Sequence, residues 1–254
     1  MLFPFCTTKQ SPYRIRTSTL GASSSITTRS RAQIPDIIIT VMQLSPTDRA
    51  RSVQAMFSRI ARRYDLMNRI MTVGQDVRWR REVIARLNLP PQRRILDLGA
   101  GTGDLSIEAL TQYPTCRPTA ADFTLEMMRV GRRRPEAAAI DWLAADALSI
   151  PFPSCIFDAV VSGFLMRNVV DINRALQEQV RVLKQGGYLI ILDTTRPQKN
   201  LFNPLVQVHL NMVIPFLGRL VARQKEAYRY LPESTQSFLS AEELAVRMHQ
   251  AGLT

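Results

Sequence analysis

Three glycines at alternate positions, Gly99, Gly101 and Gly103, form the part of this sequence best suited to chemistry. They follow an apolar run at residues 95–98 and precede Asp104. Glycine tolerates a left-handed backbone and leaves room for a ligand to approach the main chain. A helix that begins after such a turn offers free N–H groups to a polar ligand. The spacing therefore predicts a strand, a nucleotide-binding turn and a helix.

The turn differs from the dinucleotide fingerprint G-x-G-x-x-G, because Asp104 occupies the place of the third glycine. A carboxylate at this place would repel a pyrophosphate, whereas a cationic ligand that carries an amino acid group would not be repelled. The turn therefore favours S-adenosylmethionine over NAD.

Acidic residues end two later apolar segments. Asp122 ends residues 119–122, and Asp146 follows residues 142–145, while a fourth strand is expected from Phe157 onward. Each aspartate alone is as well explained by a helix cap or a turn. Their joint order favours a ligand site, because the carboxyl ends of parallel strands meet at one edge of a sheet.

The order of the predicted elements indicates an α/β fold with a doubly wound, Rossmann-like parallel sheet. Helices are expected over residues 104–113, 125–133, 173–183 and 241–250, with a helical N-terminal segment over 45–87 and a fifth strand over 188–193. Gly186 and Gly187 are expected to end the helix that precedes the fifth strand. A ligand should lie across the carboxyl ends of the first, second and fourth strands.

The chain resembles the class I S-adenosylmethionine-dependent methyltransferases and, more narrowly, the ubiquinone/menaquinone biosynthesis C-methyltransferase family. The narrower resemblance rests on residues 56–68 (MFSRIARRYDLMN), 164–169 (FLMRNV) and 228–234 (YRYLPES). The Tyr-Asp-x-Met-Asn and Arg-Asn-Val segments are specific to this family, whereas many methyltransferases share the glycine loop. The resemblance implies S-adenosylmethionine as cofactor and a demethylated polyprenyl hydroquinone as substrate.

Two positions depart from the pattern of that family. Leu165 stands where the family usually has glycine, so a different pocket shape is expected beside it. The serine that contacts the cofactor in the family falls on Gly163, with Ser162 one position earlier. Because neighbouring side chains of a strand point to opposite faces, the contact is not transferred to Ser162, and Gly163 is kept as the candidate.

The resemblance also assigns roles to residues. The candidates for catalysis are Arg167, Asn168, Tyr64 and Asp65, with packing on the core as the alternative role of Tyr64. Arginine stays protonated at ordinary pH, so Arg167 is expected to stabilise a phenolate or orient a water, and Asn168 to hold the ring oxygen or that water. The candidates for cofactor binding are Gly99, Gly101 and Gly103 for backbone clearance, Thr102 for the methionine portion, Asp122 for ribose, Asp146 and Ala147 for adenine, Asp97 for the loop or the ammonium group, and Gly163.

Composition sets outer limits on the function. A chain of 254 residues that is 46% apolar can bury one substantial core, and no apolar run is long enough to predict a transmembrane helix. Cys6, Cys116 and Cys155 lie far apart, and His209 and His249 have no potential ligands near them in sequence. The sequence therefore predicts neither a metal site nor a disulfide framework.

The formal charge of +12 is spread along the chain and comes without a recognised RNA-binding motif. Nucleic acid is not expected as a partner, and attraction to anionic lipid explains the charge equally well. Residues 196–230 carry a broad apolar face that predicts either a helical pair, packed on the sheet or in a homodimer interface, or a cover over an apolar pocket. A polyprenyl quinol would require such a cover and peripheral contact with a membrane surface.

The two ends of the chain differ from its centre. Residues 1–41 are rich in Ser, Thr and Arg and are expected to be a disordered extension, either transit-like or preceding a true start at Met42. Residues 42–254 are expected to form the methyltransferase domain, cytoplasmic and peripheral to the membrane, or organellar if the extension is a transit peptide. The resemblance implies two further strands after residue 254, so a C-terminal truncation with an unprotected fifth strand is expected.

Several readings stay open from the sequence. A methyltransferase acting on another phenol, a sterol or RNA would retain the same cofactor residues. The alternative to an enzyme is a subunit that binds the cofactor or takes part in assembly without catalysing a reaction. The choice between a benzoquinol and a naphthoquinol is open as well.

Overall fold

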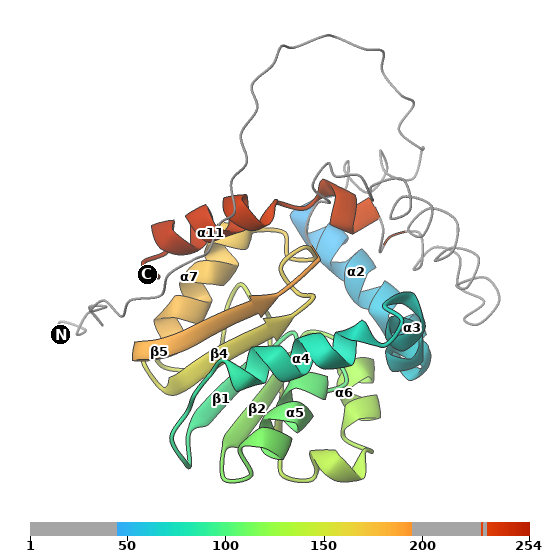
Figure 1. The fold of residues 1–254 in the computed structure, drawn as a ribbon. Coiled ribbons are helices and arrows are strands. Elements are labelled where there is room, and N and C mark those ends of the chain that lie inside the picture. Colours follow the sequence, from blue (N-terminus) through green and yellow to red (C-terminus); the bar gives the residue numbers. More distant parts are fainter. Residues whose placement is uncertain (1–44, 195–229, 231–232) are drawn as a thin grey trace.

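The computed structural model describes residues 45–194, 230 and 233–254, so the predicted extension over 1–41 and most of residues 196–230 lie outside it. Within the described residues, five parallel strands form one sheet in the order β3-β2-β1-β4-β5 (Figure 1). The strands are β1 (Arg94–Leu98), β2 (Arg117–Asp122), β3 (Asp141–Ala144), β4 (Phe157–Gly163) and β5 (Leu183–Leu192). The strand order reverses between β1 and β4, as the predicted doubly wound α/β fold requires.

Helices cover both faces of this sheet (Figure 1). The helices of the N-terminal segment are α2 (Pro46–Ile60), the 3-10 turn Ala61–Arg63, α3 (Tyr64–Met71) and α4 (Gln75–Ala85). The later helices are α5 (Asp104–Gln112), α6 (Leu125–Gly131), the 3-10 turn Pro135–Ala137, α7 (Ile172–Val182) and α11 (Ala241–Gln250). The helices predicted within the described residues are present, and α11 has the predicted bounds, whereas the alternative of a helical pair over 196–230 falls almost entirely outside these residues. No helix in the described ranges is long and apolar enough to cross a bilayer.

Alternating apolar residues of the central strands build a core on each face of the sheet. Ile95 and Val161 pack with buried residues of α4 and α5. Their sequence neighbours Leu96 and Val160 pack in a separate cluster that includes Val182 at the end of α7. Because successive side chains of a strand point to opposite faces, continuous apolar runs are what a sheet buried on both sides requires.

Side-chain caps fix where three helices begin. The Ser45 hydroxyl accepts a hydrogen bond from the Asp48 N–H at the start of α2, and Asp171 does the same for the Arg174 N–H at the start of α7. Ser240 and Glu243 form a reciprocal capping box at the start of α11. Such caps satisfy N–H groups that have no partner within the helix.

The prediction that Gly186 and Gly187 end α7 is wrong. The helix ends at Val182, and Leu183 is already extended and pairs with Phe157 of β4. The pairing register then shifts before it resumes at Tyr188, and Gly186, with φ of 71°, lies in this irregular stretch. The left-handed turn that glycine permits therefore lies inside β5, where it accommodates a bulge.

Candidate functional site

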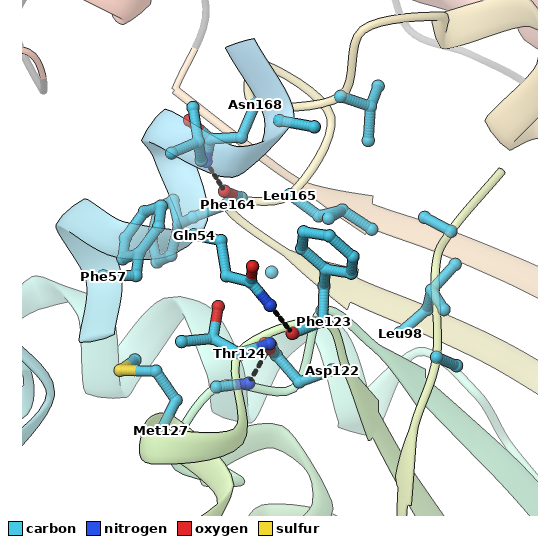
Figure 2. A pocket seen from close by; sticks show the side chains of 18 of the residues that line it. Gln54, Phe57, Leu98, Asp122, Phe123, Thr124, Met127, Phe164, Leu165 and Asn168 are labelled. Atoms are coloured by element: carbon cyan, nitrogen blue, oxygen red, sulfur yellow. Dashed lines mark hydrogen bonds between the residues drawn. The ribbon is translucent and has the colours of Figure 1, made fainter. Parts of the chain in front are cut away.

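A pocket opens at the carboxyl ends of the strands, on the side covered by α2 (Figure 2). The empty space within it, including the open mouth, is about 790 Å³. We call it the glycine-loop pocket. Its lining comes from α2, α3 and the segments that follow β1, β2, β3 and β4, and includes Gln54, Phe57, Tyr64, Gly99, Gly101, Asp122, Phe123, Thr124, Met127, Ala145, Ala147, Gly163, Phe164, Leu165 and Asn168.

The sequence predicted site residues at the carboxyl ends of β1, β2, β3 and β4, and at least one residue from each of these ends lines the pocket. The predicted site residues that line it are Tyr64, Gly99, Gly101, Asp122, Ala147, Gly163 and Asn168. Ser162 is fully buried and does not line the pocket, which agrees with keeping Gly163 as the candidate.

A smaller cavity adjoins the pocket and shares the side chains of Tyr64 and Phe164 with it. Gly99, Gly101 and Gly163 also line both spaces. The smaller cavity adds the polar residues Arg80, Asp97, Thr102 and Asp104 to the lining. Thr102 and Asp97 therefore lie next to the glycine-loop pocket.

The glycine loop has the left-handed backbone that its sequence predicts, with φ values of 69° at Gly99, 59° at Gly101 and 83° at Gly103. A Cβ atom at Gly99 would lie 2.8 Å from Cδ1 of Leu165. At Gly103 it would lie 2.7 Å from the Trp142 ring, and Gly103 does not line the pocket. Gly99 and Gly101 leave backbone facing the pocket, whereas Gly103 leaves room for a packed indole.

Asp122 joins the loop after β1 to the loop after β2. Its carboxylate accepts hydrogen bonds from the Gly101 N–H (2.7 Å) and the Thr124 N–H (2.6 Å; Figure 2). The side chain is buried, which raises its pKa above the ordinary value. Asp122 thus shapes the glycine loop as well as lining the pocket.

Asp97 holds the start of α5. Its carboxylate accepts hydrogen bonds from the N–H (3.0 Å) and the hydroxyl (2.8 Å) of Ser106. Burial raises the pKa of Asp97 to about 7. Of its two predicted roles, this geometry matches the role of holding the loop.

Asp104 is surrounded by cations. Its carboxylate lies 3.0 Å from Arg80, 2.5 Å from Arg134 and 3.3 Å from Arg69. Burial acts to raise the pKa of Asp104, but these three guanidinium groups outweigh it and lower the pKa. The charge of Asp104 is compensated within the protein, so the predicted repulsion of a pyrophosphate loses its basis, and the choice of cofactor rests on the family.

Asp65 and Asp146 have partners outside the glycine-loop pocket. Asp65 accepts a hydrogen bond from the Thr102 hydroxyl at 2.6 Å, and burial together with the charge of Asp104 raises its pKa. Asp146 is exposed and accepts a hydrogen bond from the Leu148 N–H, which closes its own turn. Neither carboxylate lines the pocket.

Arg167 and Asn168 point to different surroundings. Asn168 lines the pocket, and its Nδ2 donates a 2.8 Å hydrogen bond to the carbonyl oxygen of Phe164 (Figure 2). The guanidinium of Arg167 lies outside that lining, over the Phe164 ring at 5.3 Å and 2.5 Å from Asp193. Its buried Nε has no hydrogen-bond partner among the described residues. We expected both side chains to face the substrate site. Asn168 lines the glycine-loop pocket, whereas Arg167 does not.

Tyr64 contributes a phenol to the lining of both cavities. Its ring stands edge-on to Phe57, with 5.8 Å between the ring centroids. Burial raises the pKa of Tyr64, although the nearby charge of Arg167 acts in the opposite direction. The hydroxyl is therefore protonated at neutral pH and can act as a hydrogen-bond donor.

Sequence reasoning missed the contribution of α2. Gln54 Nε2 donates a 2.6 Å hydrogen bond to the carbonyl oxygen of Phe123, and Ser58 donates one of 2.8 Å to Glu126. These two bonds hold α2 against the segment after β2, and the Gln54–Phe123 bond lies at the pocket itself (Figure 2). Their partners lie 69 and 68 residues apart in the chain, so no local spacing could signal them.

Asp193 and Tyr230 were also missed as site residues. Both contact a predicted candidate, Asp193 binding Arg167 and Tyr230 binding Asn168. Tyr230 belongs to the 228–234 segment that carried part of the resemblance. The sequence therefore marked this residue, but it gave no indication of its contact with Asn168.

Two similar solved structures show the fold alone. The chain superposes with a TM-score of 0.57 on the [4+2]-cyclase SpnF, at 18% identity over 79% of this chain and 70% of that one. It superposes with a TM-score of 0.52 on Haemonchus contortus phosphoethanolamine N-methyltransferase 2, crystallised with S-adenosyl-L-methionine, at 18% identity over 69% and 36% of the two chains. Because one of these proteins is a cyclase, the fold does not by itself define the reaction.

Sequence comparison defines the family. A ubiquinone/menaquinone biosynthesis C-methyltransferase of Desulfotalea psychrophila is 46% identical over 200 residues, which cover 79% of this chain and 81% of the relative. A demethylmenaquinone methyltransferase of Thermus thermophilus is 43% identical over 201 residues, covering 78% and 91%. The sequence model of the ubiE/COQ5 methyltransferase family matches residues 44–254, and the chain belongs to this family.

Proposed function

We propose that this protein transfers a methyl group from S-adenosylmethionine to a ring carbon of a demethylated polyprenyl hydroquinone. The observation that carries this proposal is the meeting of the glycine loop, Asp122 and Asn168 in one pocket. The loop and Asp122 are suited to a nucleoside with an amino acid arm, and Asn168 belongs to the family segment assigned to the substrate. The names of the relatives supply the chemical class of that substrate.

The residues of the pocket fit the proposed cofactor. Gly99 and Gly101 expose backbone where a Cβ atom would meet Leu165 or Met127. Asp122 places a carboxylate beside them for the ribose hydroxyls, and the small apolar residues Ala145 and Ala147 leave space in the lining for adenine. When bound, S-adenosylmethionine supplies an electrophilic methyl group and leaves as a neutral thioether.

The chain's own residues would prepare the acceptor ring. A hydroquinone becomes nucleophilic at carbon when an adjacent ring oxygen loses its proton to water. After the methyl group has moved from sulfur to that carbon, the carbon releases its own hydrogen to water as a proton, which restores the aromatic ring. Asn168 can hold the ionised ring oxygen, and the protonated phenol of Tyr64 offers a second hydrogen-bond donor to the same pocket. Phe57 and Phe164 enclose the space with aromatic surface, which excludes water and aligns a flat ring.

Arg167 takes part from a fixed position outside the lining. Its charge lies near the phenol of Tyr64 and acts on the pKa of that group. A fixed positive charge in a buried setting stabilises a phenolate that forms nearby. Because Asp193 binds this buried guanidinium and the pair is shielded from water, we assign Arg167 to electrostatic stabilisation rather than to proton removal or to orienting water.

Contact with a membrane surface is part of the proposal. The N-terminal helical segment exposes three large apolar side chains, Leu66, Val73 and Trp79, and the chain has a formal charge of +12. Exposed apolar groups together with positive charge favour adsorption to anionic lipid, where a polyprenyl quinol resides. Homodimer formation and cellular location stay predictions.

The direct test is a methylation assay. Purified protein is incubated with labelled S-adenosylmethionine and chemically reduced demethylmenaquinol, with the oxidised quinone and a reduced benzoquinol as comparisons. The proposal expects label in a reduced quinol and none in the oxidised compound, because only the hydroquinone can form a phenolate. Calorimetric binding of the cofactor without methylation of either quinol would contradict the proposed substrate class and leave the cofactor assignment intact.

A further inference from the structure

Tyr230 reaches the site from a distant part of the chain. Its hydroxyl donates a 3.0 Å hydrogen bond to Oδ1 of Asn168, which lies 62 residues earlier. Its ring packs against the buried Met56, Ile60 and Met67 of the N-terminal helical segment. Tyr230 therefore connects that segment to the loop after β4.

The other end of the Asn168 amide is also bound. Nδ2 donates to the carbonyl oxygen of Phe164 at 2.8 Å, so one of its two hydrogens is used. If the amide were reversed, Oδ1 would face this carbonyl oxygen, and two acceptors would repel each other. The Phe164 carbonyl can only accept, so it fixes the orientation of the amide. The Tyr230 hydroxyl then donates to the amide oxygen, and one amide hydrogen is left unassigned.

This orientation decides what Asn168 can do for a substrate oxygen. An amide N–H donates a hydrogen bond and stabilises a phenolate, whereas an amide oxygen accepts the hydrogen of a neutral phenol and opposes its ionisation. Burial, together with the charge of Asp193, raises the pKa of Tyr230. These effects outweigh the charges of Arg49 and Arg167, which act to lower it. The hydroxyl therefore keeps its proton and remains a donor to Oδ1.

We propose that Tyr230 is a positioning residue for methyl transfer, which occupies the oxygen of Asn168 so that the amide N–H is presented to the ring oxygen of the substrate. This inference rests on the proposed function and extends it to a residue that does not itself line the pocket. It gives Tyr230 a defined role in the reaction, which is to help to fix whether a donor or an acceptor of Asn168 faces the substrate.

The first experiment compares Tyr230→Phe with wild type in the quinol methylation assay. Phenylalanine keeps the ring packing and removes only the hydroxyl. We expect kcat to fall about tenfold with an unchanged KM for S-adenosylmethionine, because only stabilisation of the phenolate is weakened. The pH at which kcat reaches half its maximum should rise by about one unit, since the bound phenol becomes harder to ionise.

Tyr113→Phe is the matched control. Tyr113 is half-buried at the end of α5, packs in the core on the face of the sheet covered by α4 and α5, and lies outside both cavities. Its variant should keep the wild-type rate and pH profile. A Tyr230→Phe enzyme with the same kcat and pH profile as wild type would overturn the inference.

A double-mutant cycle with Asn168→Ala separates positioning from a general loss of structure. If Tyr230 acts through Asn168, Tyr230→Phe should have no further effect on kcat in the Asn168→Ala background. Additive losses would show that Tyr230 acts by another route and would contradict the inference.

A measurement without substrate separates this inference from the proposed function. The side-chain amide of Asn168, assigned by NMR in the cofactor-bound protein, should exchange its hydrogens with solvent at least about tenfold faster in Tyr230→Phe, because one of its two anchors is lost. Equal exchange in both proteins would refute the positioning role even if quinol methylation is confirmed. Failure of the wild type to methylate any quinol, with faster exchange in the variant, would refute only the proposed substrate.

Discussion

The guanidinium of Arg167 is bound to the carboxylate of Asp193, with 2.5 Å between Nη1 and Oδ1. Oδ2 of the same carboxylate accepts a 3.2 Å hydrogen bond from the Arg167 N–H. The side chains are 5% and 1% exposed, so neither charge has water as an alternative partner. This pair ties the loop after β4 to the end of β5.

Replacing Asp193 by Ala should lower the free energy of unfolding by about 3 kcal/mol, because a buried guanidinium would lose its counter-charge. Urea unfolding provides the measurement. Glu82→Gln is the control, since its ion pair with Arg86 is exposed and should contribute less than about 0.5 kcal/mol. Similar losses in the two variants would show that the buried pair has no special role.

Asp122→Ala should weaken binding of S-adenosylmethionine at least about tenfold, because it removes the ribose partner and frees the Gly101 N–H from its hydrogen bond. Titration calorimetry measures the affinity. Asp141→Ala, at the exposed start of β3, should bind as wild type does. Near-normal affinity in Asp122→Ala would remove this residue from the cofactor site.

Gly99→Ala should be more harmful than Gly74→Ala, although both glycines have positive φ values. At Gly74 a Cβ atom meets nothing within 4 Å, so only backbone strain of about 1 kcal/mol is expected. At Gly99 the Cβ atom would also collide with Leu165, which adds about 1–3 kcal/mol. Thermal unfolding measures both losses, and Leu165→Ala should relieve part of the second one. Equal losses at the two glycines would argue against the collision.

Asp97 should make stability depend on pH. Its folded-state pKa is raised from 3.8 to about 7, so in this range the folded protein holds a proton that the unfolded chain releases. The free energy of unfolding contributed by Asp97 should therefore fall as pH rises from about 4 to about 7, and stay level above that range. Asp97→Asn keeps an acceptor for Ser106 and cannot titrate.

The measurement is urea unfolding of wild type and Asp97→Asn at about pH 5 and about pH 8. Relative to the variant, wild type should lose on the order of 2 kcal/mol between these values. A constant difference between the two proteins would show that Asp97 does not change its protonation over this range.

Local patterns in the sequence were sufficient for the elements and for the position of the site. The glycine loop, the strand that ends at Asp122 and the helix over 241–250 depend on residue spacing, backbone freedom and caps that act within a few residues. The alternation of strands and helices then required a parallel sheet whose strand ends meet. The family segments located Tyr64 and Asn168, and the structure places both at one pocket.

Only the tertiary structure decided which groups each polar side chain meets. Spacing could not show that three arginines compensate Asp104, that Asp193 holds Arg167 outside the pocket, or that α7 ends before Gly186. The partners in these contacts come from separate elements, and packing of the helices on the sheet fixes their distances. Charge and hydrogen-bond direction depend on distances of a few ångströms, so they follow from the fold as a whole rather than from any short segment.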